Sequence, residues 1–238
     1  MKLDILVFAA HPDDAELSCS GTIISHVNQG KKVGMVDFTK GELGTRGTVE
    51  IRMNEAKQAA DILGLAVREN LGFEDIYFEN DKAHQLEVIK MIRKFQPEIV
   101  LANAVEDRHP DHPKASQLAL QACFMAGLKK IETKLDGIDQ PAWRPRGVYH
   151  YIQSNFIKPD IIVDVSDYWD QRMASVKAFK SQFFNPDSRE PETFISSPQF
   201  MQLLEARATE FGKSIGVKYG EGFTVDKNMG VKSLFDLI

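Results

Sequence analysis

Short, almost uninterrupted apolar runs alternate with segments of helical spacing through the first half of the chain. The runs LDILVFAA, KVGMVDFT and EIVLANA are typical of strands that are buried on both faces. Four segments that follow or separate these runs have the apolar spacing of helices. They are AELSCSGTIISHVNQG, TVEIRMNEAKQAADILG, HQLEVIKMIRKFQ and HPKASQLALQACFMAG. The alternation predicts an α/β fold, a Rossmann-like, doubly wound, mainly parallel sheet with helices on both faces.

The alternation loosens in the second half of the chain. RGVYHYIQ and DIIVDVS predict further strands, and QFMQLLEARATEFGKSIG predicts a late helix. The proline-rich and charged segment FFNPDSREPET predicts a mobile loop. Because the 238 residues contain no internal repeat and no low-complexity linker, residues 1–238 are expected to form a single domain.

Composition and charge exclude several classes of protein. The chain is 43% hydrophobic and 26% charged, which is ordinary for a globular protein. A net charge of -5 offers no general attraction to nucleic acid, and no stretch reaches the roughly 18 apolar residues of a membrane span. The two cysteines, Cys19 and Cys123, lie in helical patterns and are interpreted as core residues. We therefore expect a cytoplasmic protein with neither nucleic-acid nor membrane partners.

Two clusters of histidine and aspartate follow buried strands. HPDD, residues 11–14, comes directly after the first apolar run, and EDRHPDHPKA, residues 106–115, follows EIVLANA. If the two strands are neighbours in a parallel sheet, both clusters lie at the same edge. Each cluster alone has another interpretation, since an aspartate of HPDD could cap the following helix and RHPDHP could be a solvated loop.

Together the two clusters offer ligands for a divalent metal ion. Imidazole and carboxylate are good zinc ligands, and His11 and Asp14 are spaced so that a turn entering a helix could direct both at one ion. His112 could supply the third ligand from the second cluster. Three protein ligands leave a position for water or substrate, which is the arrangement of a metal-assisted hydrolase.

The remaining residues of the clusters are candidates for proton transfer. Asp13 is adjacent to Asp14 but points in another direction, so we expect it to be the general base beside the attacking water. His109 and Asp111 could form a hydrogen-bonded pair in which a protonated histidine faces the leaving group or the oxyanion. Either could instead orient a metal ligand.

The two motifs AHPDDAE and HPDH together resemble the LmbE-like, or PIG-L, family of zinc-dependent N-acetylglucosamine deacetylases. The similarity extends over TKGELGTRGTVEIRMNEA, VYHYIQ, KAFKSQF and YGEGF. It implies one zinc ion per chain, with Fe²⁺ as a competing metal, and a ligand set of His11, Asp14 and His112. It also implies that Asp13 is the general base and that His109, supported by Asp111, is the acid or the oxyanion partner.

The resemblance also implies a small-molecule N-acetylglucosaminyl substrate and a homo-oligomer, with a hexamer among the forms. Within the family, the sequence is most similar to the branch that deacetylates N-acetyl-α-D-glucosaminyl L-malate in bacillithiol biosynthesis. Chitooligosaccharide or other N-acetylglucosamine deacetylases are the alternative. The two carboxylates of malate require cations. The expected substrate-binding residues are Arg52, which matches a sugar-contacting arginine of the family, and Arg108, followed by Lys40 and Arg46. Without the resemblance, Arg52 is read as an exposed helix residue paired with Glu55 or a neighbour.

A few residues remain open to two interpretations. Some relatives carry a tyrosine before the last long helix, but here Phe194 and Phe200 occupy that region, either closing over the substrate or packing in the core. His150 is read as a buried histidine with a backbone partner or as a substrate contact, and Glu221 as a turn residue or an active-site contact.

Two other functions remain as alternatives to deacetylation. Metal-dependent phosphoester hydrolysis would require more carboxylate ligands and a second metal ion. A catalytically silent sugar-binding protein on the same fold would have no use for Asp13, an acid that is not needed as a ligand.

Overall fold

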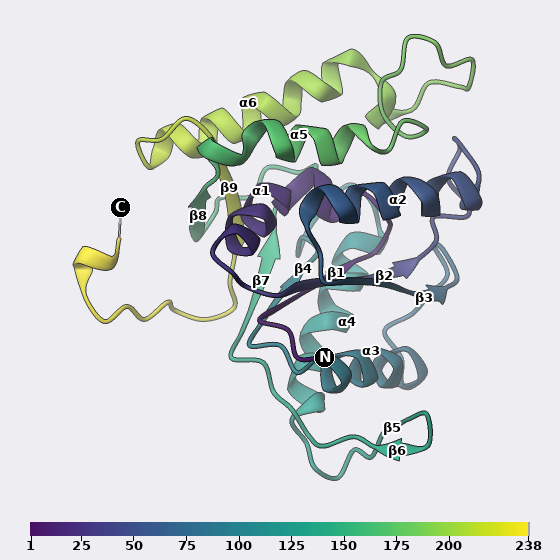
Figure 1. Cartoon of the computed structure of the whole chain (residues 1–238), viewed down its shortest axis with the longest axis vertical. Coiled ribbons are helices and arrows are strands. Elements are labelled where there is room, and N and C mark those ends of the chain that lie inside the picture. Colours follow the sequence, from purple (N-terminus) through teal and green to yellow (C-terminus); the bar gives the residue numbers. More distant parts are fainter. Residues whose placement is uncertain (238) are drawn as a thin grey trace.

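A seven-stranded sheet forms the centre of the computed structural model, which describes residues 1–237, and helices cover both of its faces (Figure 1). The strand order is β3-β2-β1-β4-β7-β9-β8. The strands are β1 (Ile5–Ala9), β2 (Val33–Thr39), β3 (Val67–Phe73), β4 (Ile99–Ala102), β7 (Gly147–Tyr151), β8 (Ile161–Asp164) and β9 (Gly220–Thr224).

The first five strands of this order are parallel, and β9 pairs antiparallel with both β7 and β8. The predicted Rossmann-like, mainly parallel sheet is therefore confirmed. Two strands of this sheet were not predicted. β3 lies at the edge of the sheet with the polar sequence VRENLGF, and β9 contains two glycines, so neither has an apolar run.

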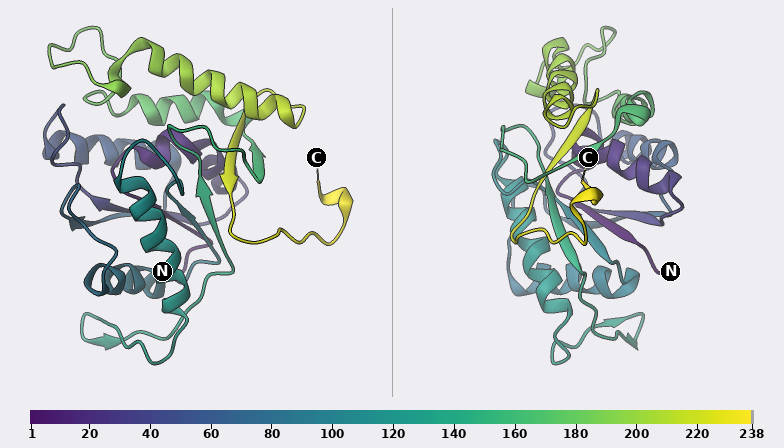
Figure 2. Two further views of the ribbon diagram at one scale, coloured as in Figure 1. Left: turned by 180° about the vertical axis from the view of Figure 1, so that it is seen from behind. Right: turned by 90° about the vertical axis from the view of Figure 1, so that its left-hand side faces the viewer.

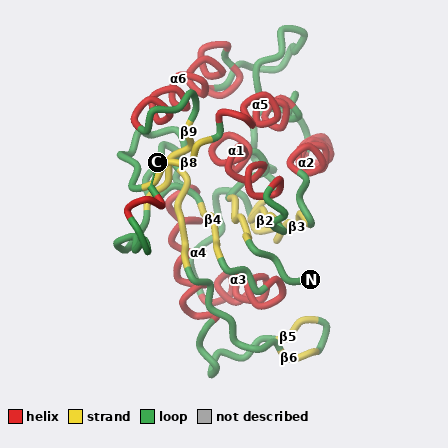
Figure 3. The backbone as a smooth tube through the Cα atoms, turned by 60° about the vertical axis from the view of Figure 1, so that its left-hand side comes forward, coloured by secondary structure: helices red, strands yellow, loops and turns green. Residues whose placement is uncertain are grey.

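The two faces of the sheet have different helical layers. Helices α3 (Lys82–Phe95) and α4 (Asp111–Ala126) cover one face, and α1 (Asp14–Asn28) and α2 (Val49–Leu63) cover the other (Figures 1 and 3). Along β1, Leu6 and Phe8 belong to the core under α3 and α4, whereas Val7 and Ala9 belong to the core under α1. Burial on both faces explains why the strand is a continuous apolar run.

A third layer lies outside α1 and α2. It consists of α5 (Trp169–Lys177) and the long helix α6 (Pro198–Ser214), which run above the first two helices (Figure 1). The 183–193 segment is a loop, as predicted, but the buried Arg46 donates hydrogen bonds to its Pro191 carbonyl and Ser188 hydroxyl. A short hairpin of β5 (Lys134–Leu135) and β6 (Ile138–Asp139) projects from the other end of the molecule, and the C-terminal segment leaves the body after β9 (Figure 2).

Helix α1 is kinked at Cys19, whose φ of -143° is not helical. The kink frees the backbone N–H groups of Gly21 and Thr22, which donate to the carboxylate of Glu221 at 2.9 and 2.7 Å. Arg172 of α5 donates to the same buried carboxylate at 2.9 Å. Glu221 therefore lies in a strand rather than a turn, and it joins β9 to α1 and α5.

The position of β1 beside β4 brings the two histidine clusters together. The strands are parallel, with Val7 opposite Leu101, so the loops that follow them leave the same edge of the sheet. This adjacency confirms the expectation on which the site prediction depends. No helix within residues 1–237 has the length and apolar character needed to cross a membrane.

Candidate active site

The turn after β1 is strained and folded back on itself. Asp13 has a φ of 125°, which is rare for a residue with a side chain and typical of functional sites. Its carboxylate makes no capping hydrogen bond to α1. The carboxylate of Asp14 instead accepts the backbone N–H of His11 at 2.9 Å. Helix capping therefore does not explain this motif.

Asp14 lies against both of the other expected metal ligands, His11 and His112, although it is in neither of the described side-chain groups whose ligand atoms all lie within 4.8 Å of one another. Nδ1 of His11 lies 3.5 Å from Oδ2 of Asp14, and Nε2 of His112 lies 3.1 Å from Oδ1 of the same carboxylate. The Asn103 side chain, at the end of β4, donates to Oδ2 at 3.0 Å, and Gln153 donates to Oδ1 at 3.2 Å. The side-chain amides of Asn103 and Gln153 thus hold the Asp14 carboxylate between the two imidazoles.

In each of these two histidines, the ring nitrogen that does not face Asp14 lies against one or more other carboxylates. Nε2 of His11 lies 3.0 Å from Asp75 and 3.2 Å from Asp111, and Nδ1 of His112 lies 3.1 Å from Asp107. Such carboxylate–histidine pairs fix the orientation of metal-ligating imidazoles. Sequence reasoning missed Asp75 and Asp107; Asp107 stands in the second cluster, where its charge was a usable signal, whereas Asp75 follows the unpredicted strand β3.

Electrostatics keeps this set of groups charged. Burial opposes a charge on His11, but hydrogen bonds with Asp111, Asp14 and Asp75 outweigh it and raise its pKa well above the usual range. Burial would raise the pKa of Asp14, yet the nearby His112 and His11 bring that pKa well below its usual range. The ionised carboxylate of Asp14 is a ligand that zinc and related ions prefer, and an ion bound here would displace the proton of each imidazole, because histidine binds metal in its neutral form.

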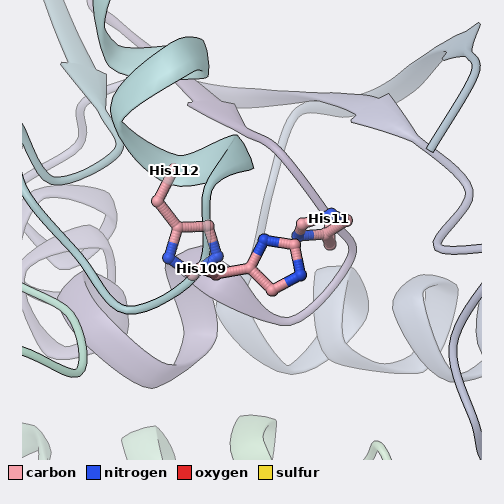
Figure 4. Close-up of side chains that lie close together, drawn as sticks. All are labelled: His11, His109 and His112. Atoms are coloured by element: carbon pink, nitrogen blue, oxygen red, sulfur yellow. The ribbon is translucent and has the colours of Figure 1, made fainter. Parts of the chain in front are cut away.

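Two groups of described side chains have spacing suited to a metal ion. They are His11, His109 and His112, which lie together in Figure 4, and His11, Asp75 and Asp111; within each group the ligand atoms lie within 4.8 Å of one another. Asp75 and Asp111 also accept backbone N–H groups at 3.0 Å and engage the Nε2 side of His11. The other ring nitrogen of His11 faces Asp14.

Asp13 is held by Arg52 rather than by the other members of its motif. Nη2 of Arg52 donates to Oδ2 of Asp13 at 2.9 Å, and its Nε donates to the carbonyl of Pro12 at 3.0 Å. Burial raises the pKa of Asp13 to about 7, although Arg52 opposes the shift. The alternative partner of Arg52, Glu55, instead accepts hydrogen bonds from Ser181, so that interpretation is wrong.

His109 differs from its expected state. The expected hydrogen bond from the His109 ring to the Asp111 carboxylate is wrong, because that carboxylate lies against His11 while the backbone N–H of Asp111 donates to Nδ1 of His109 at 3.3 Å. Burial, together with the charges of His11 and His112, lowers the pKa of His109 to about 4. The ring is therefore neutral near pH 7 rather than protonated, and with Nδ1 as acceptor its proton lies on Nε2.

These residues lie in a cavity of about 320 Å³, a volume in the range of small-molecule sites. Of the expected substrate-binding residues, Arg46, Arg52 and Arg108 line it. Lys40 is exposed at the end of β2 and does not line it. The guanidinium of Arg46 donates to Ser181, Ser188 and Pro191, which assigns it to loop anchoring.

The structure also shows where the residues that had two interpretations in the sequence lie. His150 is buried, and its Nδ1 lies 2.8 Å from the Ser116 hydroxyl and 3.1 Å from the carbonyl of Asn103, so it is a structural histidine outside the cavity. Phe200 is buried, whereas Phe194 is 49% exposed where the cavity meets solvent. Both cysteines are buried free thiols, as predicted.

Comparison with known proteins gives consistent results. Residues 6–123 match the model of the PIG-L family, described as GlcNAc-PI de-N-acetylase. The chain is 30% identical to diacetylchitobiose deacetylase of Thermococcus kodakarensis over 92% of this chain and 81% of that protein. It is 28% identical to 4-oxalmesaconate hydratase of Pseudomonas putida over 74% of this chain and 73% of that one. It is also 24% identical to the probable N-acetyl-alpha-D-glucosaminyl L-malate deacetylase 2 of Bacillus anthracis, over 75% and 81%.

Among solved structures, the conserved protein TT1542 from Thermus thermophilus superposes with a TM-score of 0.85 at 34% identity. The match covers 97% of this chain and 98% of the other. Sequence and fold thus agree over almost the full length. The chain belongs to the PIG-L, or LmbE-like, family of N-deacetylases.

Proposed function

We propose that this protein is a metal-dependent amide hydrolase that removes the acetyl group from an N-acetylglucosaminyl conjugate. The observation that carries the proposal is the placement of Asp13. It lies beside three converging metal-ligand candidates without being one of them, and it lines the same cavity. A site for binding alone would have no use for a buried carboxylate held at a strained φ of 125°.

The same proposal assigns the metal to His11, Asp14 and His112, with zinc as the ion and Fe²⁺ as the competitor. All three line the cavity, and the two imidazoles are oriented from behind by Asp75, Asp111 and Asp107. When bound, such an ion polarises a carbonyl oxygen and lowers the pKa of water to about 7.

The remaining steps belong to residues of the chain. Asp13 accepts the proton of the attacking water, and Arg52 fixes the carboxylate by holding Oδ2. His109 donates its Nε2–H to the acetamide oxygen as negative charge develops there, for which a neutral imidazole is sufficient. Asp13 then returns the proton to the departing amine, so that acetate and the glucosaminyl conjugate with a free amine are formed.

Two groups attached to the N-acetylglucosamine are candidates for the specific substrate. The sequence resemblance favours the L-malate conjugate of bacillithiol biosynthesis, and a 24% identical relative carries that name. A 30% identical relative is named for diacetylchitobiose, which matches the chitooligosaccharide alternative. Both substrates present an N-acetylglucosamine, which is what the catalytic residues engage.

The proposal retains three further predictions. Residues 1–238 form one LmbE-like domain. The protein is cytoplasmic, which is supported by two free thiols of the kind that a reducing compartment preserves. It is also a homo-oligomer, with a hexamer among the forms, which light scattering on the purified protein would measure.

One assay tests the proposed function. Zinc-loaded and iron-loaded protein is incubated with the malate conjugate, diacetylchitobiose and free N-acetylglucosamine, and released acetate and primary amine are quantified. Equal amounts of acetate and amine are expected from at least one conjugate, with about one ion per chain by mass spectrometry. The absence of acetate from every sugar would favour the silent sugar-binding protein, and two ions per chain would favour phosphoester hydrolysis. Because one relative is named as a 4-oxalmesaconate hydratase, the protein is also tested for hydration of 4-oxalmesaconate, which is expected not to occur.

A further inference from the structure

The catalytic residues occupy only one part of the cavity, and another part of its wall is formed by apolar side chains. Helix α6 presents residues at helical spacing to the cavity, and the 3₁₀ turn Phe194–Ser196 and the loop before α2 extend this surface. The apolar wall, as we name it, consists of Leu43, Phe194, Phe200, Leu203, Leu204 and Phe211. Leu203 is 39% exposed and Phe194 is 49% exposed, so the wall reaches from the buried site to solvent.

The cationic side chains of the cavity are almost all engaged by the protein itself. Arg52 is bound to Asp13, and Arg172 is bound to Glu221. Arg207 donates to three backbone carbonyls of the 153–155 segment. Because these guanidinium groups already have partners, a ligand anion would have to displace buried hydrogen bonds to reach them.

The guanidinium of Arg46 is likewise bound to the 181–191 loop by hydrogen bonds. Among the arginines of the cavity, this leaves only Arg108 to consider. Arg108 has no hydrogen bond to any residue in the described part of the chain, and it lies 4.5 Å over the ring of Phe194. Within residues 1–237 no lysine lines the cavity. A group with two carboxylates would thus find a single guanidinium without a hydrogen-bonding partner, that of Arg108, among the described side chains of the cavity.

We propose that the group attached to the N-acetylglucosamine is uncharged and apolar, such as an aryl or alkyl aglycone, and that it packs on the apolar wall. This inference rests on the proposed function, because it places the acetamide beside Asp13 and lets the aglycone extend toward α6. Burial of an apolar group is favourable in proportion to the area removed from water. A dicarboxylate in the same place would lose hydration without gaining paired cations.

The test compares three N-acetylglucosaminides that differ only in the aglycone: methyl, phenyl and malyl. The phenyl glycoside is expected to have a kcat/KM at least about tenfold above the methyl glycoside, and the malyl conjugate is expected to fall below the phenyl one. A malyl value equal to or above the phenyl value overturns the inference. So does a phenyl value equal to the methyl value, because the wall would then make no contact with the aglycone.

Two leucines of equal exposure provide a matched pair of variants. Leu203 is 39% exposed in the cavity wall, and Leu128 is 38% exposed after α4, outside the cavity. Leu203→Lys is expected to lower the phenyl-to-malyl ratio of kcat/KM by about tenfold, whereas Leu128→Lys leaves the ratio unchanged. Equal effects of the two substitutions, or no effect of Leu203→Lys, would contradict the placement.

Binding without turnover separates this inference from the proposed function. In Asp13→Asn protein, calorimetric titration is expected to give a lower Kd for the phenyl than for the malyl glycoside. If no sugar is deacetylated by the wild-type protein but the phenyl glycoside still binds more tightly, the proposed function fails and the apolar wall stands. If acetate is released but the malyl conjugate binds more tightly, only the apolar aglycone is rejected.

Discussion

Nη2 of Arg52 lies 2.9 Å from Oδ2 of Asp13, so a buried guanidinium on α2 holds the carboxylate that we assign as the general base. Nε of the same side chain donates to the carbonyl of Pro12, and a lysine could not make both bonds. We expect Arg52→Lys to lower kcat by about 10- to 100-fold because Asp13 is no longer held in position. The measurement is steady-state acetate release at constant metal content. Arg144→Lys, an exposed substitution outside the cavity, should leave kcat unchanged.

Asp13 and Asp14 should respond differently to loss of charge. Asp13→Asn is expected to lower kcat by about 100-fold or more while the protein retains its metal, because the side chain transfers protons and is not a ligand. Asp14→Asn should lose both activity and metal, since its carboxylate lies between His11 and His112. Metal content by mass spectrometry and acetate release are measured on the same preparations. Retention of turnover by Asp13→Asn would eliminate its role.

His109 should act as a hydrogen-bond donor rather than as a cation. Because its pKa is lowered to about 4, the neutral ring has only its Nε2–H to offer the acetamide oxygen. His109→Ala is expected to reduce kcat by about 100- to 1000-fold, and His109→Gln by less, since glutamine retains an N–H donor. Both variants should bind metal normally. Loss of metal from His109→Ala would instead place His109 in the ligand set with His11 and His112.

Arg68 should be essential for folding rather than for chemistry. It lies between the buried carboxylates of Asp37 and Glu16, with bonds of 2.8 and 3.0 Å to Asp37. Arg68→Met leaves both carboxylates without their cation and is expected to lower the free energy of unfolding by about 3–5 kcal/mol. Urea denaturation measures this change.

The control for Arg68 is an ion pair at the same edge strand. Lys94 lies 2.6 Å from Glu69 of β3, and both side chains are 30% exposed. Lys94→Met should change the free energy of unfolding by less than about 1 kcal/mol. Equal losses in the two variants would show that burial does not distinguish the pairs.

The two cysteines should be unreactive in the folded protein. Cys19 and Cys123 are buried, and burial raises the pKa of both thiols, so little thiolate forms near neutral pH. We expect no reaction with an aromatic disulfide reagent under native conditions and two thiols per chain in denaturant. Rapid labelling of the native protein would contradict the burial of these residues.

The sequence was sufficient to predict the parts of the site that are built from local patterns. His11, Asp13, Asp14 and His112 follow apolar strands, and the parallel sheet brings those strand ends together. Strand β3 was missed because an exposed edge strand need not be apolar, and Asp75 was missed with it.

The sequence could not show which partners these side chains choose. Whether the Asp111 carboxylate faces His109 or His11 depends on how the start of α4 lies against the β1 turn, and no spacing rule contains that information. The same holds for Arg46, whose charge suggested substrate binding but whose donors are taken by the 181–191 loop. Local pattern determines which residues reach the site, and tertiary packing determines which of them remain free to act.

The hydrogen bond between Gly21 and Glu221 joins residues that are 200 positions apart, and it constrains the order in which the protein can mature. During synthesis, the N–H groups of Gly21 and Thr22 cannot reach the carboxylate of Glu221 until β9 has left the ribosome. Residues 6–123 contain every expected metal ligand, yet a fragment of that length lacks both Glu221 and Arg172. A nascent chain should therefore complete the contacts that join α1, α5 and β9 only after residue 221 has been synthesised.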